Sequence, residues 1–428
     1  MDVVVIGAGV VGAGIALELA KSGRDVLVLD KGGGAGLGST SASSAIVRFH
    51  YSTFEGVAVA WEAKFRWEEW PDYLGTTDPA GLARYTRTGV LAFQFPGLDF
   101  ERLTAHYDQI GVPYEWLTGP ALQRAFPDLD TGRYYPPRRL DDDSFWDDPA
   151  GEVTALWTPD GGFVDDPPLA AHNLLHAAMA RGARARFHAR VRGVEVEGGA
   201  VRSVTLASGE RVPARAVVNA AGPHSGEINA LAGATADFSI STRPLRQEVH
   251  RVLGPARPGG TIPVVNDGDL GTYFRRDASG GILVGSQEPP CDPLIWIEDP
   301  DRHDARASAA AYEAQSTRLA RRVPGARIPQ AAAGIAGIYD VSSDWIPVYD
   351  RTGIDGYYVA IGTSGNQFKN APVIGGMVTA IIDACEAGHD HDARPVTWLA
   401  AHAGVAVSLG HYSRLRTRNP HSSNSVLG

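Results

Sequence analysis

The feature that most constrains the fold of this chain lies at its N-terminus, in residues 2–31 (DVVVIGAGVVGAGIALELAKSGRDVLVLDK). A β-branched run leads into Gly7, Gly9 and Gly12, and an apolar helical pattern follows them. A second short strand then ends at Asp30. Glycines in this spacing let the backbone approach a pyrophosphate at a helix N-terminus, while the carboxylate can bind ribose hydroxyls. The segment therefore predicts a dinucleotide-binding α/β domain and leaves NAD and FAD both open.

Composition narrows the class of protein further. The 428 residues, 44% of them hydrophobic, are enough for about two domains. An excess of 49 acidic over 39 basic residues disfavours nucleic acid and anionic membranes as partners. Cys291 and Cys385 are far apart without metal-ligand spacing, so we predict no metal site and a reducing, cytoplasmic location. The glycine-broken N-terminus argues against a signal peptide or membrane span, and the polar residues after about 410 predict a loosely held tail.

A later stretch, residues 187–222, favours FAD over NAD. Its alternating segments break at Gly198–Gly199 and at Ser208–Gly209, which predicts a small antiparallel meander. The meander leads into AVVNAAG, an apolar strand that ends in small residues. A strand that returns to the nucleotide in this way recurs in two-domain flavoproteins, where Ala221 and Gly222 would let the chain pass close to the cofactor. An ordinary hairpin followed by a core strand is the alternative.

The early loop GSTSASSAIVRFHYS (38–52) adds a family resemblance. It resembles the loop after the second strand in amine-oxidising flavoproteins of the D-amino-acid-oxidase superfamily, especially the monomeric sarcosine oxidase group. The resemblance continues through residues 161–183, the meander and GIYDVSSDWIPVYD (337–350), and it finishes in IGTSGNQFKNAPVIGG (361–376). It covers most of residues 1–398 and is weakest through 230–330.

The resemblance implies an α/β fold with two domains. A discontinuous Rossmann-like domain (1–80, 150–235 and 330–400) would bind FAD, and a substrate domain (81–149 and 236–329) would consist of an antiparallel sheet with helices, before a tail at 401–428. The glycine-rich loop would form the second wall of the flavin site, and the helix after Pro372 would point its positive end at the flavin. The residues expected to contact FAD are Gly7, Gly9, Val10, Val11, Gly12, Asp30, Lys31, Ser39, Thr40, Ser43, Ser44, Val191, Ala221, Gly222, Gly337, Gly362, Gly365, Asn366, Gln367, Phe368 and Lys369.

The same resemblance implies a site for a substrate carboxylate. The family places an arginine near the end of the early loop and a lysine in the glycine-rich loop, and Arg48 and Lys369 occupy these places. His50 would share the face of Arg48 on a strand, either as a second polar contact or as a packed side chain. Among polar residues at alternating positions, Gln247, His250, Tyr273 and Arg275, some would face the cavity. Of these four, Tyr273 is expected to contact the substrate. The other expected substrate-site residues are Tyr339 and Gln287.

Two features of the family are absent from this sequence. The cysteine that bonds covalently to flavin is replaced by Gly337, and the early loop has no histidine, so we predict non-covalent FAD. The lysine that promotes the reaction with oxygen aligns without gaps to Leu283, with Arg275 or Arg276 as possible substitutes. A superoxide-like charge needs a nearby cation, so this difference favours a dehydrogenase that passes electrons to a partner over an oxidase.

The predicted reaction is oxidation of a carbon–nitrogen bond in an amino acid or N-substituted amino acid. Hydride would pass from the carbon next to nitrogen to flavin N5, and water would hydrolyse the imine. Three alternatives stay open: a 2-hydroxy-acid dehydrogenase, which would need a base such as histidine, a non-catalytic flavoprotein subunit, and a nicotinamide enzyme. The last leaves the C-terminal glycine-rich loop without a role.

Overall fold

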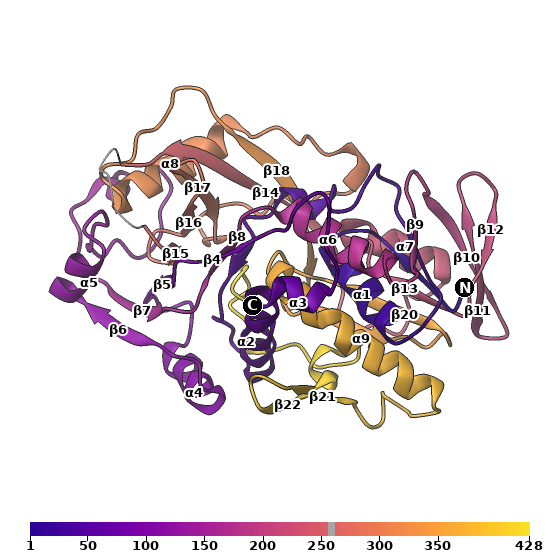
Figure 1. Ribbon diagram of the computed structural model, residues 1–428. Coiled ribbons are helices and arrows are strands. Elements are labelled where there is room, and N and C mark those ends of the chain that lie inside the picture. The colour runs from indigo at the N-terminus through magenta and orange to yellow at the C-terminus, as the bar shows by residue number, and fades with distance from the viewer. Residues whose placement is uncertain (256–261) are drawn as a thin grey trace.

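The computed structural model describes residues 1–255 and 262–428, and a six-stranded sheet brings together strands from residues 3 to 361 (Figure 1). The strand order is β19-β20-β13-β1-β2-β9. Neighbouring strands are parallel except β19, which runs antiparallel to β20. The strands are β1 (Val3–Ile6), β2 (Val26–Leu29), β9 (Arg184–Arg186), β13 (Ala216–Asn219), β19 (Val348–Arg351) and β20 (Tyr357–Ile361).

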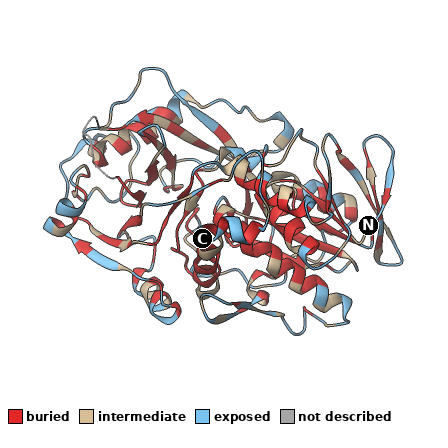
Figure 2. Cartoon of the chain, in the orientation of Figure 1, coloured by how far each residue is buried: buried red, intermediate tan, exposed pale blue. Residues whose placement is uncertain are grey.

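Both faces of this sheet are covered, which explains why its inner strands β20, β13, β1 and β2 are mostly apolar runs without alternation. Val3 and Val5 pack in the core with three helices, α1 (Val10–Lys21), α6 (Pro167–Met179) and α9 (Ala371–Glu386). Val4 and Ile6 face the other side, where the predicted meander and helix α7 (Ser225–Ala232) lie. Figure 2 shows the central strands and α1 almost wholly buried, and Figure 1 shows the meander at one end of the molecule. The meander strands are β10 (Val191–Glu197), β11 (Ala200–Leu206) and β12 (Arg211–Pro213).

A second, eight-stranded sheet has the order β18-β14-β17-β16-β15-β5-β7-β6 (Figure 1). It is mainly antiparallel, with β5 and β15 as a parallel pair, and helix α8 (Ala309–Arg322) packs against β14, β16 and β17. The antiparallel strands expected in residues 236–329 are therefore present, as β14, β15, β16 and β17. The strands are β5 (Val90–Phe93), β6 (Glu115–Thr118), β7 (Thr154–Thr158), β14 (Thr242–Leu253), β15 (Val264–Asp267), β16 (Thr272–Arg276), β17 (Gly281–Ser286) and β18 (Gly334–Ser342).

The remaining elements join the two sheets. Helix α2 packs its apolar residues into the core, and the Thr53 side chain caps it by accepting a hydrogen bond from Gly56 N. The other elements are α2 (Phe54–Glu68), α3 (Trp70–Leu74), α4 (Phe100–Ile110), α5 (Gly119–Ala125), the small sheet of β3 (Ile46–Val47), β8 (Gly162–Val164) and β4 (Tyr85–Arg87), and the pair β21 (Thr397–Ala400) and β22 (Val405–Ser408).

We keep the predicted domain boundaries as a proposal, with two differences in sheet membership. Strands β7 and β18 belong to the eight-stranded sheet, although they lie in ranges assigned to the dinucleotide domain. Among the helices that the structure describes, none has the length and apolar character needed to cross a membrane.

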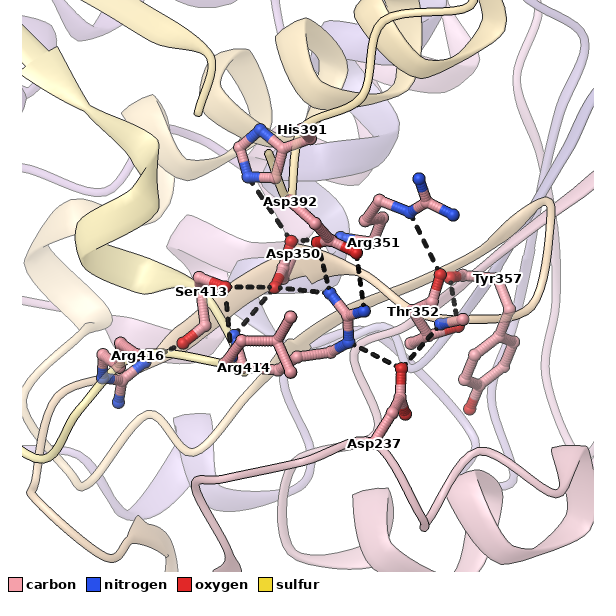
Figure 3. Close-up of polar contacts among 12 residues, drawn as sticks. Asp237, Asp350, Arg351, Thr352, Tyr357, His391, Asp392, Ser413, Arg414 and Arg416 are labelled. Carbon is pink, nitrogen blue, oxygen red and sulfur yellow. Dashed lines mark hydrogen bonds and ion pairs between the residues drawn. The ribbon is translucent and has the colours of Figure 1, made fainter. Parts of the chain in front are cut away.

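The C-terminal tail is not loosely held, which corrects the prediction made from its polar composition. Arg414, only 3% exposed, donates to Asp350, Asp237 and Asp392, as Figure 3 shows. Two residues after Arg414, Arg416 donates to the carboxylate of Asp344. Buried ion pairs with several hydrogen bonds fix the tail in a way that composition alone does not reveal. The C-terminal end reaches the middle of the molecule, beside α2 (Figure 1).

Candidate active site

A cavity of about 700 Å³ lies at the carboxyl ends of the parallel strands and reaches the eight-stranded sheet. Residues that follow β1, β2 and β13 form one wall, while β15, β16 and β18 contribute the opposite wall. Open α/β sheets bind ligands at this edge, because the loops after the carboxyl ends of the strands meet there. The volume is that of a site for a cofactor-sized molecule.

The glycine motif forms a tight turn at the floor of the cavity. Gly7 has φ 110° and a Cβ there would lie 2.3 Å from the Ala220 carbonyl oxygen, so only glycine fits. A Cβ on Gly12 would lie 2.0 Å from the Gly7 oxygen, which explains the close packing of α1 on the turn. Helix α1 begins at Val10, whose N–H donates to the Thr40 hydroxyl at 3.1 Å, and Gly9, Val10 and Thr40 all line the cavity. The helix N-terminus is thus presented to an anion.

Asp30 closes the cavity floor at the end of β2. Its carboxylate accepts hydrogen bonds from Ala8 N at 2.6 Å and Gly32 N at 2.7 Å, and the residue lines the cavity. It therefore lies beside the glycine turn, where the sequence predicts a ribose contact. Of the residues expected to contact FAD, those that line the cavity are Gly7, Gly9, Val10, Val11, Asp30, Lys31, Ser39, Thr40, Ser43, Ser44, Val191, Ala221, Gly222, Gly337, Gly365, Asn366, Gln367, Phe368 and Lys369.

Two of the expected cofactor residues, Gly12 and Gly362, do not line the cavity. Gly12 supports the turn from behind, as described above. Gly362 has φ 63° and donates its N–H to the Asp340 carboxylate at 2.6 Å. Both glycines therefore shape the backbone around the site. Asp340 itself lines the cavity, and its burial raises its pKa to about 7.

At the mouth, Asp301 connects the two walls of the cavity. It lies in a short helical turn, Pro300–Arg302, and forms ion pairs with Lys31 and Arg190 and a contact with His224 Nε2 at 3.0 Å. Although partial burial opposes it, these partners lower the pKa of Asp301. Sequence reasoning missed Asp301, Arg190 and His224, because their proximity depends on how the loops meet.

Arg48 and Lys369, which are far apart in the sequence, meet at one end of the cavity. They are 4% and 2% exposed, and their charged groups lie 5.1 and 5.0 Å from the ring centroid of Tyr51. Lys369 Nζ donates to the Asn366 carbonyl at 2.6 Å. Within the described residues, neither cation has a carboxylate at ion-pair distance. Burial lowers the pKa of both groups, and the charge of Arg48 further lowers the pKa of Lys369 to well below its usual value.

The wall formed by the eight-stranded sheet contributes neutral polar groups. Tyr273 and Asn266 are paired in register on β16 and β15, and both line the cavity. Tyr273 Oη lies 3.3 Å from Ser44 Oγ, and Tyr339 lines the cavity from β18. Burial raises the pKa of both tyrosines, so they are neutral at physiological pH. Asn266 was not predicted, although a polar residue within a buried strand is a usable signal. Its side-chain nitrogen has no hydrogen-bond partner within the described part of the chain.

Three residues considered for the substrate side do not line the cavity. His50 follows Arg48 in a loop rather than a strand, so the two do not share a strand face, and His50 packs near Tyr107. Burial and the two cations lower its pKa to about 3. Gln287 is buried outside the cavity wall, and Leu283 is paired with Arg275 on the neighbouring strand. The alignment of Leu283 with the oxygen-promoting lysine stays a prediction.

The other polar residues considered on these strands also do not line the cavity. Gln247 donates to Glu288 at 2.8 Å, and Arg275 Nε donates to the carbonyl of the cavity-lining Ser44 at 2.7 Å. His250 is fully buried behind the sheet, next to Tyr312.

Gly337 lines the cavity next to the turn Ser39–Ala42. A Cβ at position 337 would lie 2.7 Å from the Ala42 Cβ, so a cysteine does not fit there without movement of the turn. This contact agrees with the expectation of non-covalent cofactor binding, which stays a prediction.

One potential metal-binding group lies outside the cavity. Asp78, His172 and His176 bring three ligand atoms within 4.8 Å of one another, a group that sequence spacing did not suggest. The Asp78 carboxylate accepts hydrogen bonds from Ala80 N and the Asn173 amide, and His176 Nε2 contacts the Thr77 carbonyl. These contacts already account for the arrangement.

The fold and the cavity indicate a dinucleotide-dependent enzyme built on two large sheets. Comparison with known proteins identifies its family. The family model described as FAD dependent oxidoreductase (DAO) matches residues 2–381. The chain therefore belongs to this family of FAD-dependent oxidoreductases. The cradle of Gly7, the N-terminus of α1 and the acceptor Asp30 fit the phosphates and ribose of FAD, and the cavity-lining loop Gly365–Lys369 would lie at the flavin end.

Two relatives are similar over most of the chain. Glycine oxidase from Geobacillus kaustophilus (strain HTA426) is 25% identical over 398 residues, which cover 91% of this chain and 94% of the relative. Sarcosine oxidase subunit beta from Arthrobacter sp is 25% identical over 385 residues, with 87% and 85% covered. Among solved structures, L-proline dehydrogenase from P. horikoshii has a TM-score of 0.75 at 24% identity, with 97% of both chains covered. That likeness shows the shared fold.

Proposed function

We propose that this protein oxidises the carbon–nitrogen bond of an amino acid or N-substituted amino acid whose carboxylate is bound by Arg48 and Lys369. The observation that carries the proposal is the pair of buried cations at one end of the cavity, without a carboxylate partner among the described residues. Two buried positive charges without an anion are unfavourable, and a substrate carboxylate would neutralise them. The similarity to proteins named glycine oxidase and sarcosine oxidase subunit beta supports this class of substrate.

The side chains of the chain would bind and orient the substrate. Arg48 offers a planar fork that matches a carboxylate, and Lys369 adds a point charge to the same anion. Tyr273, Tyr339 and Asn266 lie on the opposite wall, where their neutral groups can accept from or donate to the amine. When bound, FAD accepts the hydride from the carbon next to nitrogen. The protein contributes orientation and exclusion of water, and no charged general base is required.

The main competing activity, oxidation of a 2-hydroxy acid, would be expected to use a histidine base over the substrate. The histidines that line the cavity within the described chain are His224 and His303, and His224 lies at the mouth beside Asp301. His50 lies outside the cavity wall and its lowered pKa leaves it neutral. The arrangement of the site thus favours an amine substrate over a hydroxy acid.

Anaerobic reduction of the purified holoenzyme by a panel of amino acids and N-methyl amino acids tests the proposal. We expect at least one of these amines to bleach the flavin, and 2-hydroxy acids of the same size to fail. Arg48→Lys keeps the charge but loses the fork, so it should raise the concentration needed for half-maximal reduction about tenfold or more while FAD content stays unchanged. If no carboxylate-bearing amine reduces the wild type and Arg48→Lys loses FAD, the two cations belong to the cofactor site and the non-catalytic alternative is correct.

A further inference from the structure

The C-terminal residues 425–428 reach the substrate end of the cavity and contact its carboxylate-binding arginine. Val426 lines the cavity, and its carbonyl oxygen accepts a hydrogen bond from Arg48 Nη2. The Val426 N–H donates to the Glu288 carboxylate at 2.9 Å, so both backbone polar groups of Val426 have partners. Arg48 therefore has a ligand from its own chain in the absence of substrate.

The apolar side chains of this segment are packed into the protein. Val426, 8% exposed, lies in a cluster with Leu245, Val341 and Trp345, and Leu427 is 2% exposed. A Cβ built on Gly428 would lie 2.9 Å from the Tyr51 side chain, so the segment also approaches the ring that lies near both cations. Residues 425–428 thus occupy space on the side of the cavity that the substrate carboxylate would approach.

The chain that precedes this segment is well placed to let it move. Arg414 and Arg416 anchor the tail through carboxylates, and the Asn419 side chain donates to Ser52 at 3.0 Å (Figure 3 shows the Arg414 contacts). Between this anchor and the packed segment, Pro420, His421 and Asn424 are exposed. Release of residues 425–428 would leave the anchor in place, because its ion pairs lie on the other side of the exposed stretch.

We propose that residues 425–428 are an internal ligand of the substrate site, which the substrate carboxylate displaces from Arg48. This inference rests on the proposed function. One guanidinium cannot give the same N–H to the Val426 carbonyl and to a substrate oxygen, and a carboxylate is the stronger partner. Together with the His50 carbonyl, which accepts from Arg48 Nη1, the segment satisfies a buried arginine while the site is empty. It also lowers the apparent affinity for substrate, by the fraction of molecules in which it is released.

The test measures binding of propionate, a carboxylate without an oxidisable amine, to the FAD-loaded enzyme through the change in flavin absorbance. Deletion of residues 423–428 removes the ligand, and Val426→Ser with Leu427→Ser weakens its packing without shortening the chain. Leu415→Ser is the matched control, since Leu415 is an apolar residue of the same tail, is 46% exposed and lies outside the cavity. Hydrogen exchange at the Val426 amide in the wild type reports the position of the segment directly.

We expect the deletion and the double substitution to lower the propionate dissociation constant by about tenfold or more, and the control to leave it unchanged. In the wild type, saturating propionate should increase hydrogen exchange at Val426. Equal affinities in the wild type and both tail variants, with unchanged exchange, would mean that the segment is a fixed wall, and the inference would be wrong while the proposed function stands. If propionate binds to none of the forms and no amine of the panel reduces the flavin, the carboxylate site itself is wrong and the inference fails with it. Should the deletion variant fail to fold, the double substitution and the wild-type exchange still decide between these outcomes.

Discussion

Replacement of Lys369 by methionine separates the effect of this side chain on substrate from its effect on the fold. Methionine keeps a long unbranched side chain and removes the charge. In the structure Lys369 is 2% exposed, and its ammonium donates to the Asn366 carbonyl, which also accepts from Tyr51 Oη at 2.7 Å. The substitution therefore leaves no buried acceptor without a donor.

The structure sets the expected size and sign of two effects. Loss of a hydrogen bond to a charged partner, worth about 1.5–3 kcal/mol, should raise the dissociation constant for a substrate carboxylate about ten- to a hundredfold. The ligand-free protein should become more stable, by about 1–3 kcal/mol, because a poorly compensated buried charge is removed. Since the folded pKa of Lys369 lies below its ordinary value of 10.5, the unfolded chain binds the proton more tightly. The gain should be largest at pH values below the folded pKa of Lys369 and should shrink as pH rises from there toward 10.5.

The assay combines anaerobic flavin reduction by the best amine with urea unfolding at several pH values. Lys64→Met is a matched control, because Lys64 is also buried, at 5% exposure, but forms an ion pair with Glu68 at 3.0 Å and lies outside the cavity. That variant should bind substrate normally and should gain no stability. FAD content should stay at the wild-type level in both. The reasoning fails if Lys369→Met binds substrate as tightly as the wild type, or if it loses FAD.

Three further predictions follow from other parts of the site. Acid precipitation should release all of the FAD, because position 337 has no cysteine and no room for one, and flavin retained by the precipitated chain would contradict this. Reduced enzyme should pass electrons to a dye or quinone faster than to oxygen, since the wall formed by the eight-stranded sheet offers the neutral groups of Asn266 and Tyr273, and rapid peroxide formation in air would show that a cation elsewhere in the cavity, such as Arg48 or Lys369, promotes the reaction. Burial raises the pKa of Glu288 to about 8, so the unfolded chain loses this proton first and the free energy of unfolding should fall as pH rises from 4.5 to about 8. Glu288→Gln should flatten that fall in urea titrations, and an unchanged slope would refute the assignment.

The sequence by itself determined the local parts of this protein. The glycine spacing from Gly7 to Gly12 followed by Asp30 determines the dinucleotide turn, because close backbone approach at these positions excludes every larger side chain. The meander and the helix that starts at Pro372 are equally local, since turn residues and apolar spacing specify them. The resemblance added Arg48 and Lys369, which lie 321 positions apart in the chain.

Only the tertiary structure decided which of these residues meet. His50 was placed on an assumed strand, and the end of β3 at Val47 leaves it in a loop, outside the cavity wall. The polar tail gave no sign that Val426 would contact Arg48, because the ion pairs of Arg414 that bring it there join segments far apart in sequence. Whether Arg48 and Lys369 have an anionic partner depends on every segment packed around them, because those segments set the burial and the nearby charges. Such contacts arise when the sheets and the tail come together, and no local pattern encodes them.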